Sequence, residues 1–270
     1  GTLCNDLLKT FVKFKDFYDS LEINLLEICD KLKKIQKLKI DNKKVKWIKK
    51  INEVKFGPAI FLGNEFFDGL PIKQIYKKKK LFFEKFVGLS EDHKKLKFLY
   101  KKANNNLVRH VQDLNLISNG NIIEYPITAL NFLKSIAKKI NKLGGGLLTF
   151  DYGYVSKKNQ NTLQSVKKHR YINPLIVPGH SDITSHINFR LFHKILKKNK
   201  LNVKKITTQN EFLKKVGILE RANILSKKMT FKEKANMFYR LKRLLDYKEM
   251  GGQFKVIFAQ EKNGKFSLGF

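Results

Sequence analysis

The feature that most constrains the fold is a succession of short apolar runs separated by segments with helical periodicity. Apolar runs of strand length occupy residues 21–28, 58–62 and 147–150. Apolar residues recur at helical intervals in residues 2–17, 31–38 and 125–143. Strands that alternate with helices form a mostly parallel sheet with helices on both faces. We therefore predict an α/β fold of the Rossmann-like kind.

The remaining segments add an insertion and an antiparallel edge to this prediction. Residues 72–76 and 81–87 flank a lysine-rich turn and predict a hairpin. Further helices are predicted over residues 92–102, 182–198 and 231–245, and further strands over residues 201–206, 254–259 and 266–270. The hairpin and helices within residues 72–125 are expected to form an inserted subdomain. Residues 1–270 are otherwise expected to form a single domain.

The net charge of +33 raises the question of nucleic-acid binding. The chain has 50 Lys but only 6 Arg, whereas phosphate and base recognition favours the guanidinium fork of Arg. The lysines are scattered along the chain, which indicates solvated faces. Nucleic acid is therefore not the expected partner, although an excess of charge alone gives a non-specific attraction to it.

Other classes of protein are disfavoured by the same composition. There is no run of 18 apolar residues, so no membrane span is expected. Cys4 and Cys29 predict two free thiols and no disulfide framework. Four histidines lie in the same stretch of the chain: His169, His180, His186 and His193. Their spacing matches no zinc pattern, so no metal site is expected.

Polar residues follow the apolar runs at the points where ligands bind open α/β sheets. They are Glu27, the group Asn64, Glu65 and Asp68, and the pair Asp151 and Tyr152. Gly1 opens the first predicted helix, where a cofactor can approach the backbone and the helix dipole. An acidic residue in the position of Glu27 can accept hydrogen bonds from both ribose hydroxyls of a nucleoside cofactor.

Asn64, Glu65 and Asp68 lie within five residues of one another. Carboxylates at such a corner bind and orient a cationic acceptor such as a guanidinium. The alternative interpretation is a helix cap, with Asn64 as the capping residue and Glu65 in the first turn. Asp182 is likewise predicted to cap the helix over residues 182–198.

Six stretches of the chain match, in order, the motifs of a known family. They are Gly1-Thr2-Leu3, Leu26-Glu27 with Gln36, residues 64–71, residues 145–153, the segment from Thr162 to Phe189, and Met250-Gly251 with Phe254 and Lys255. The sequence Asn-Glu-Phe-Phe-Asp-Gly-Leu-Pro at residues 64–71 is close to the family signature Asn-Glu-x-x-Asp-Ala-x-Pro. On these motifs the chain resembles the MidA-type S-adenosylmethionine (SAM)-dependent methyltransferases, which include the mitochondrial assembly methyltransferase of respiratory complex I.

The resemblance implies SAM as methyl donor and a protein acceptor, with an arginine on a complex I core subunit as the expected target. It assigns Gly1, Glu27 and Asn64 to the cofactor, and Asn64, Glu65 and Asp68 to catalysis. It places five further residues around the acceptor: Asp151, Tyr152, His169, Asp182 and His186. A cytoplasmic location is expected for a bacterial protein and the mitochondrial matrix for a eukaryotic one. The oligomeric state is left open.

The family's glycine loop, Glu-x-Gly-x-Gly-x-Gly-Thr-Leu, begins before Gly1. The first strand and the front of this loop are therefore expected to precede the 270 residues, which by themselves are expected to bind SAM poorly or not at all and to be inactive as an enzyme. Two other functions stay open for the same fold. One is a nucleic-acid methyltransferase, and the other is a non-enzymatic assembly or binding protein.

Overall fold

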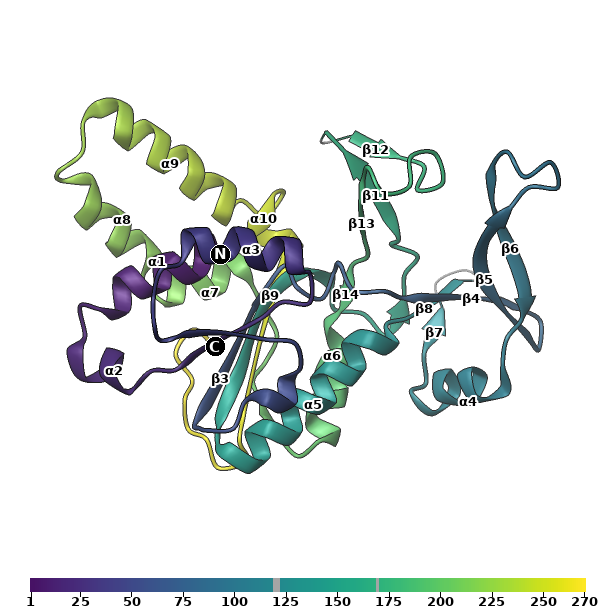
Figure 1. Cartoon of the computed structure of the whole chain (residues 1–270), viewed down its shortest axis with the longest axis horizontal. Helices are drawn as coiled ribbons and strands as arrows, with labels where there is room; N and C mark the ends of the chain where they lie inside the picture. Colours follow the sequence, from purple (N-terminus) through teal and green to yellow (C-terminus); the bar gives the residue numbers. More distant parts are fainter. Residues whose placement is uncertain (119–121, 169) are drawn as a thin grey trace. The chain divides into compact units, whose positions relative to one another are not determined.

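The computed structural model describes residues 1–118, 122–168 and 170–270. The chain divides into two compact units, Gly1–Gly57 and Pro58–Phe270 (Figure 1), and each is described by itself. The predicted α/β class is confirmed, because parallel strands and helices alternate in both units.

The first unit is a small parallel βαβ element preceded by helices. It contains α1 (Thr2–Phe11), α2 (Lys15–Ser20), β1 (Ile23–Leu26), α3 (Asp30–Lys39), β2 (Val45–Ile48) and the short helix η1 (Ile51–Glu53). The strands β1 and β2 pair in parallel, with Ile23 opposite Val45. The helix predicted over residues 2–17 is therefore two helices. The strand β2, in which Val45 and Ile48 are buried and Lys46 is exposed, was not predicted.

The centre of the second unit is the long strand β9 (Gly145–Tyr154). It pairs in parallel with β3 (Ala59–Asn64) and with the short β14 (Ile187–Asn188), and antiparallel with β17 (Phe254–Gln260). Two short strands, β15 (Asn202–Val203) and β16 (Thr207–Thr208), extend the sheet beyond β17. Gly145 has a φ of 101°, and a methyl group at this position would lie 2.2 Å from the carbonyl oxygen of Ala59. Only glycine therefore fits where β9 starts beside β3.

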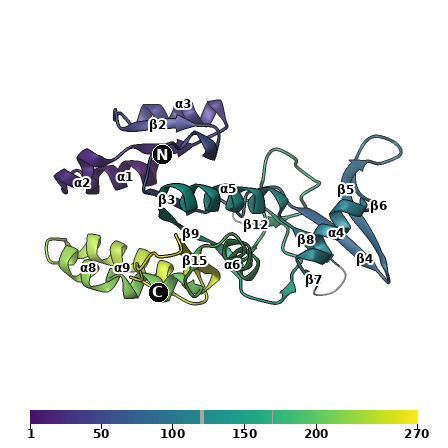
Figure 2. The same cartoon turned by 90° about the horizontal axis from the view of Figure 1, so that it is seen from below.

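Helices pack on this sheet and bury its apolar face. The helix α5 (Ile127–Leu143) packs on β3 and β9, and α6 (Phe189–Lys198) packs on β9 and β17. The helix α7 (Gln209–Lys215) covers β17, and α10 (Met250–Gln253) leads into that strand. The helices α8 (Ile218–Ser226) and α9 (Phe231–Leu245) form a helical hairpin that extends from one end of this unit (Figures 1 and 2).

The opposite end of the unit carries an antiparallel sheet within the predicted insertion. Its strands, in spatial order, are β6 (Leu96–Lys102), β5 (Leu81–Leu89), β4 (Lys73–Lys78) and β8 (Ile122–Tyr125). The predicted hairpin is present as β4 and β5. The helix predicted over residues 92–102 is wrong: the whole length of β6 pairs with β5, from Phe83 to Leu89, and that pairing outweighs the local spacing. Nearby are α4 (Asn105–Asp113) and the parallel pair β7 (Ile117–Ser118) and β10 (Lys158–Asn159).

Two other segments differ from their predicted elements. Residues 182–198 are helical only from Phe189, because β13 (Asp182–Thr184) and β14 precede α6. The strand β13 pairs with β11 (Gln164–Lys167), which also pairs with β12 (Arg170–Ile172). Residues 266–270 form no strand, although Phe266 and Phe270 both pack against Phe258 of β17. Their apolar residues therefore cover the sheet edge without joining it.

Candidate functional site

Glu27 lies directly after β1 and is held by its neighbours. One carboxylate oxygen accepts a hydrogen bond from the backbone N–H of Cys29 at 2.9 Å. The other accepts from the side-chain amide of Gln36 at 2.9 Å, and the Gln36 oxygen accepts from the indole N–H of Trp47 at 2.8 Å. This relay from β2 through α3 fixes the orientation of the Glu27 carboxylate.

The Glu27 carboxylate keeps capacity for a ligand. A carboxylate offers about four lone-pair positions, and these two bonds use two of them. Glu27 is half-buried, so the remaining positions are available to hydroxyl donors. The ribose of SAM presents two vicinal hydroxyls, which are hydrogen-bond donors, and the acceptor oxygens of Glu27 therefore fit that group. Gln36 and Trp47 were not predicted to have this role, although Gln36 stood in the matched segment.

Gly1 lies beside the same helix. A methyl group at this position would lie 3.1 Å from Ile40 Cδ1 and 3.6 Å from the Cα atom of Gln36. The start of α1 is thus in close contact with α3, the helix that carries the partner of Glu27. The structure brings Gly1 and Glu27 to the same helix, and a larger residue than glycine would push these segments apart.

The second group of predicted residues lies where β3 ends beside β9. Asn64 is the last residue of β3, and the backbone N–H of Glu65 donates to the carbonyl of Phe150 at 3.0 Å. Glu65 adopts a left-handed conformation with φ of 49°, which is uncommon for a residue with a Cβ atom. Turns and bends follow, not a helix, so the interpretation of Asn64 as a helix cap is wrong. Asn64 and Glu65 are both exposed.

Asp151 anchors the loop that follows Glu65. It is fully buried in β9, and its carboxylate accepts hydrogen bonds from the backbone N–H of Phe67 at 2.9 Å and of Tyr152 at 3.0 Å. Burial, and after it the nearby carboxyl of Asp68, raises the pKa of Asp151 to about 7. Because Asp151 is out of contact with solvent, its role is to position this loop.

Asp68 is the second carboxyl of the loop. Burial raises the pKa of Asp68, and the charge of Glu65 adds to the rise. The Asp68 carbonyl accepts a hydrogen bond from the backbone N–H of Ser185 at 3.0 Å. The loop is therefore held on one side by β9 and on the other by the segment between β13 and β14. A carboxyl group with a raised pKa is a better proton acceptor than an ordinary aspartate.

Tyr152 and His186 form an aromatic wall next to these carboxyls. The Tyr152 ring lies 4.1 Å from the ring of Phe254 and is stacked on His186 at 6.3 Å, measured between ring centroids. Burial raises the pKa of the Tyr152 hydroxyl, and the charge of Glu65 raises it further. Burial lowers the pKa of His186. The structure thus gathers six predicted residues in one region: Asn64, Glu65, Asp68, Asp151, Tyr152 and His186.

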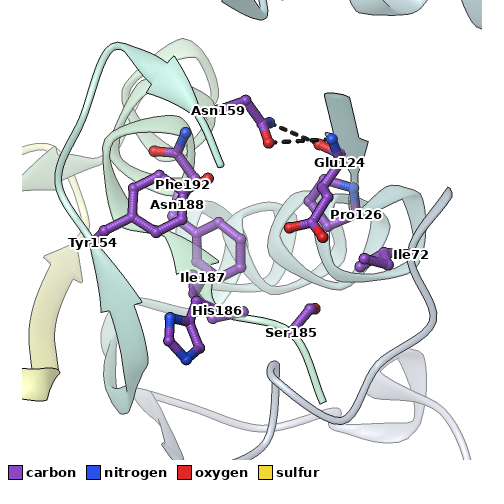
Figure 3. A pocket seen from close by; sticks show the side chains of 10 residues that line it. All are labelled: Ile72, Glu124, Pro126, Tyr154, Asn159, Ser185, His186, Ile187, Asn188 and Phe192. Atoms are coloured by element: carbon purple, nitrogen blue, oxygen red, sulfur yellow. Dashed lines mark hydrogen bonds between the residues drawn. The ribbon is translucent and has the colours of Figure 1, made fainter. Parts of the chain in front are cut away.

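Glu124 is a buried carboxylate that the sequence analysis did not single out. It accepts hydrogen bonds from the side chain of Gln74 at 2.9 Å, from the Thr162 backbone at 2.9 Å and hydroxyl at 2.7 Å, and from the Leu163 backbone at 2.9 Å. Its own backbone is paired with the Asn159 side chain (Figure 3). The Thr162 hydroxyl in turn accepts from the backbone N–H of His186 at 2.8 Å. Glu124 therefore links the antiparallel sheet to the aromatic wall.

Two further predicted residues are Asp182 and His169. Asp182 begins β13, where it is exposed and pairs with Val166, so its prediction as a helix cap is wrong. His169 lies outside the described residues. Within the described ranges, no three or more His, Cys, Asp or Glu residues are arranged to hold a metal ion.

Comparison with known families now identifies the chain's relatives. Residues 1–207 match the family described as "Putative S-adenosyl-L-methionine-dependent methyltransferase". The chain belongs to this family. The predicted resemblance is therefore confirmed, and SAM is the cofactor that the family implies. The residues of the first unit fit that cofactor, since Glu27 retains acceptor capacity for ribose hydroxyls.

Several curated proteins are similar to most of the chain. The mitochondrial protein arginine methyltransferase NDUFAF7 of Xenopus tropicalis is 27% identical over 94% of this chain and 64% of its own length. The human protein of the same name is 24% identical over 94% of this chain and 62% of its own length. The chain thus spans less than two thirds of these relatives. A protein of Burkholderia thailandensis crystallised with S-adenosyl-homocysteine shares the fold, with a TM-score of 0.81, 22% identity, and coverage of 100% of this chain and 71% of that one.

Proposed function

We propose that the protein transfers a methyl group from SAM to an arginine side chain of a protein acceptor. The observation that carries this proposal is the exposed Glu65 beside Asp68, in a loop anchored by Asp151 at the end of β3. The names of the NDUFAF7 relatives support arginine as the target.

The chemistry of the acceptor accounts for the two carboxyls. A guanidinium is a poor nucleophile, because its lone pairs are delocalised and it is protonated at neutral pH. A carboxylate pair orients one nitrogen and accepts the proton that must leave it. The exposed Glu65 is suited to pairing with the guanidinium, and Asp68, with its raised pKa, is suited to accepting the proton. Bound SAM supplies a methyl group activated by its sulfonium charge.

The cofactor and acceptor roles are divided among the remaining residues. Glu27 would accept hydrogen bonds from the ribose, with Gln36 and Trp47 fixing its orientation. Tyr152 and His186 would shape the acceptor pocket as flat walls. We place Asp182 and His169 in that pocket only on the motif that they share with the family.

On the family resemblance, we propose a core subunit of a complex I-type respiratory enzyme as the acceptor. We also propose the mitochondrial matrix as the location in a eukaryote, which the names of the mitochondrial relatives support. Among the described residues, none of the helices has the length and apolar character needed to cross a membrane.

A nucleic-acid acceptor is the competing function. Its phosphates would be repelled by Glu65 and Asp68, which lie where the acceptor is proposed to bind. A non-enzymatic binding protein would have no need for this carboxyl pair. The proposal and the two alternatives therefore predict different effects on methyl transfer when the charge of Glu65 is removed.

The test uses Glu65→Gln in the full-length protein, with Glu91→Gln as the matched control. Glu91 is an exposed glutamate of the antiparallel sheet region, with a side chain 99% exposed and a weak ion pair to Lys97 at 3.6 Å. We expect Glu65→Gln to retain SAM binding and lose about 10²-fold in methyl transfer, the cost of a misplaced reacting group, because Glu65 pairs with and orients the guanidinium.

The assay is incorporation of radiolabelled methyl groups into a lysate from cells that lack the protein, followed by hydrolysis and separation of methylarginines. Label in methylarginine, lost in Glu65→Gln and kept in Glu91→Gln, supports the proposal. Label in RNA or DNA, or full activity of Glu65→Gln, would contradict it.

A further inference from the structure

A groove of about 360 Å³ adjoins the proposed acceptor site. One wall is the loop of residues 68–72, which begins with the proposed catalytic Asp68. A second wall is the antiparallel sheet of β4, β5 and β6, and a third is the β13 segment with Ser185. The volume lies within the range of about 300–1,000 Å³ typical of ligand sites. The groove is therefore continuous with the loop that carries the proposed chemistry.

The walls of the groove expose large apolar side chains. Val87 of β5 is 57% exposed, and Ile183 of β13 is 46% exposed. Both line the groove, together with Phe98 of β6, which lies opposite Val87 on the same face of the sheet. Apolar side chains gathered in one concave surface are typical of sites that bind another molecule.

A fixed cation lies in the same groove. The Lys85 ammonium donates to the side-chain oxygen of Gln74 at 2.9 Å and lies 3.7 Å from the ring centroid of Phe98. Gln74 is held in turn through its amide by Glu124 at 2.9 Å and Asn161 at 2.8 Å. Half-burial lowers the pKa of Lys85. An ammonium has three donors, so Lys85 has capacity to pair with an anionic group of a ligand.

The groove thus carries the Asp68 carboxyl on one wall and the Lys85 ammonium on another, with apolar residues between them. A nucleic acid would place phosphates against Asp68. A polypeptide can present a cation and an anion a few residues apart, with apolar atoms between them. Charge complementarity therefore favours a peptide segment.

We propose that this groove binds the segment of the acceptor protein next to its methylated arginine, and that Lys85 selects an acidic residue in that segment. The proposal rests on the function proposed above and names the determinant of its acceptor specificity. Val87, Phe98 and Ile183 would cover the apolar atoms of the segment.

The test measures binding of fluorescein-labelled synthetic peptides by anisotropy, with the full-length protein and S-adenosylhomocysteine present. Each peptide carries one arginine in a glycine–serine background, flanked by aspartates or by lysines. We expect the parent to bind the aspartate peptide about tenfold more tightly, the effect of one charge-assisted hydrogen bond. Lys85→Met should remove this preference, and Lys85→Glu should reverse it.

Two further variants distinguish binding in the groove from a non-specific effect of the protein's charge. Lys78→Glu changes the charge equally at an exposed position of β4 outside the groove and should keep the preference. Val87→Asp alters an exposed wall residue, at little cost in folding stability, and should weaken binding of the aspartate peptide. Circular dichroism verifies that each variant is folded.

The outcomes distinguish this inference from the proposed function. Equal binding of both peptides by the parent, no saturable binding of either, or an unchanged preference in Lys85→Glu would overturn the groove assignment. Displacement of the peptide by a single-stranded oligonucleotide would also overturn it. If peptides with citrulline in place of arginine bind equally while the Lys85-dependent preference persists, arginine as the target fails and the groove assignment stands.

Discussion

At the scale of single residues, the candidate site depends on carboxylates in different surroundings. Glu65 is exposed and free to meet an acceptor, while Asp151 is buried and bonded to two backbone N–H groups. Residue type alone could not separate these roles, because both are acidic residues that follow apolar runs. Their difference arises from the strand register, which turns Asp151 towards the loop of residues 66–68.

The raised pKa of Asp151 predicts a pH-dependent stability. Its folded pKa of about 7 lies above the ordinary value of 3.8, so the folded state holds one extra proton between these values. Stability should therefore fall as pH rises through that window, by up to about 1.4 kcal/mol per pH unit. Urea unfolding of the parent and of Asp151→Asn at pH 4.5 to 6.5 tests this. The variant should be less stable overall and have a shallower slope, whereas parallel slopes would refute the assignment.

The loop's own packing gives a second prediction. Phe67 is 2% exposed, and its ring lies 5.1 Å from that of Phe192 in α6. Phe67→Ala should lower the free energy of unfolding by about 3–5 kcal/mol, the cost of a large buried cavity. Phe231→Ala, at a side chain 89% exposed, is the control and should change it by less than about 0.5 kcal/mol. Equal effects of the two substitutions in urea unfolding would show that the loop is not packed as described.

At the scale of elements, long segments with a strong pattern were predicted well. The helix over residues 231–245 has its predicted bounds, because Thr230 and Glu233 form a capping box at its start. The strand β9 extends the predicted run at 147–150 on both sides. Residues 92–102 and 182–188 were wrongly predicted as helical, because partners distant in sequence draw them into sheets.

The capping box gives a prediction for α9, a helix in which no residue is buried. Its stability should depend strongly on local interactions. Thr230→Ala should cost about 1 kcal/mol and speed amide hydrogen exchange in the first turns of α9 about fivefold. Lys232→Ala, in the same turn but outside the cap, should leave exchange nearly unchanged. Equal exchange rates in Thr230→Ala and the parent would exclude this role for the cap.

At the scale of the whole molecule, the order of the elements and motifs along the chain predicted the fold class and the family better than any single motif. The alternation of strands and helices indicated the fold class, and the motifs at Glu27, residues 64–71 and residues 145–153 indicated the family. Neither could reveal Glu124, which binds Thr162 far along the chain, or Lys85, whose groove is lined from the other side by Ile183. For the same reason, the sequence did not connect Trp47 with Glu27: the two residues come together only because β2 pairs with β1.

The central claim is that this is a SAM-dependent enzyme in which Glu27 holds the cofactor ribose. Titration calorimetry of SAM into the full-length protein, Glu27→Ala and Glu22→Ala tests it most directly. Glu22 is the control, because it precedes the same strand and forms an ion pair with Lys46. We predict that Glu27→Ala weakens binding by about 1.5–3 kcal/mol, or about 10- to 150-fold, while Glu22→Ala binds like the parent. Equal SAM affinity in Glu27→Ala and the parent, with both proteins folded, would contradict the account.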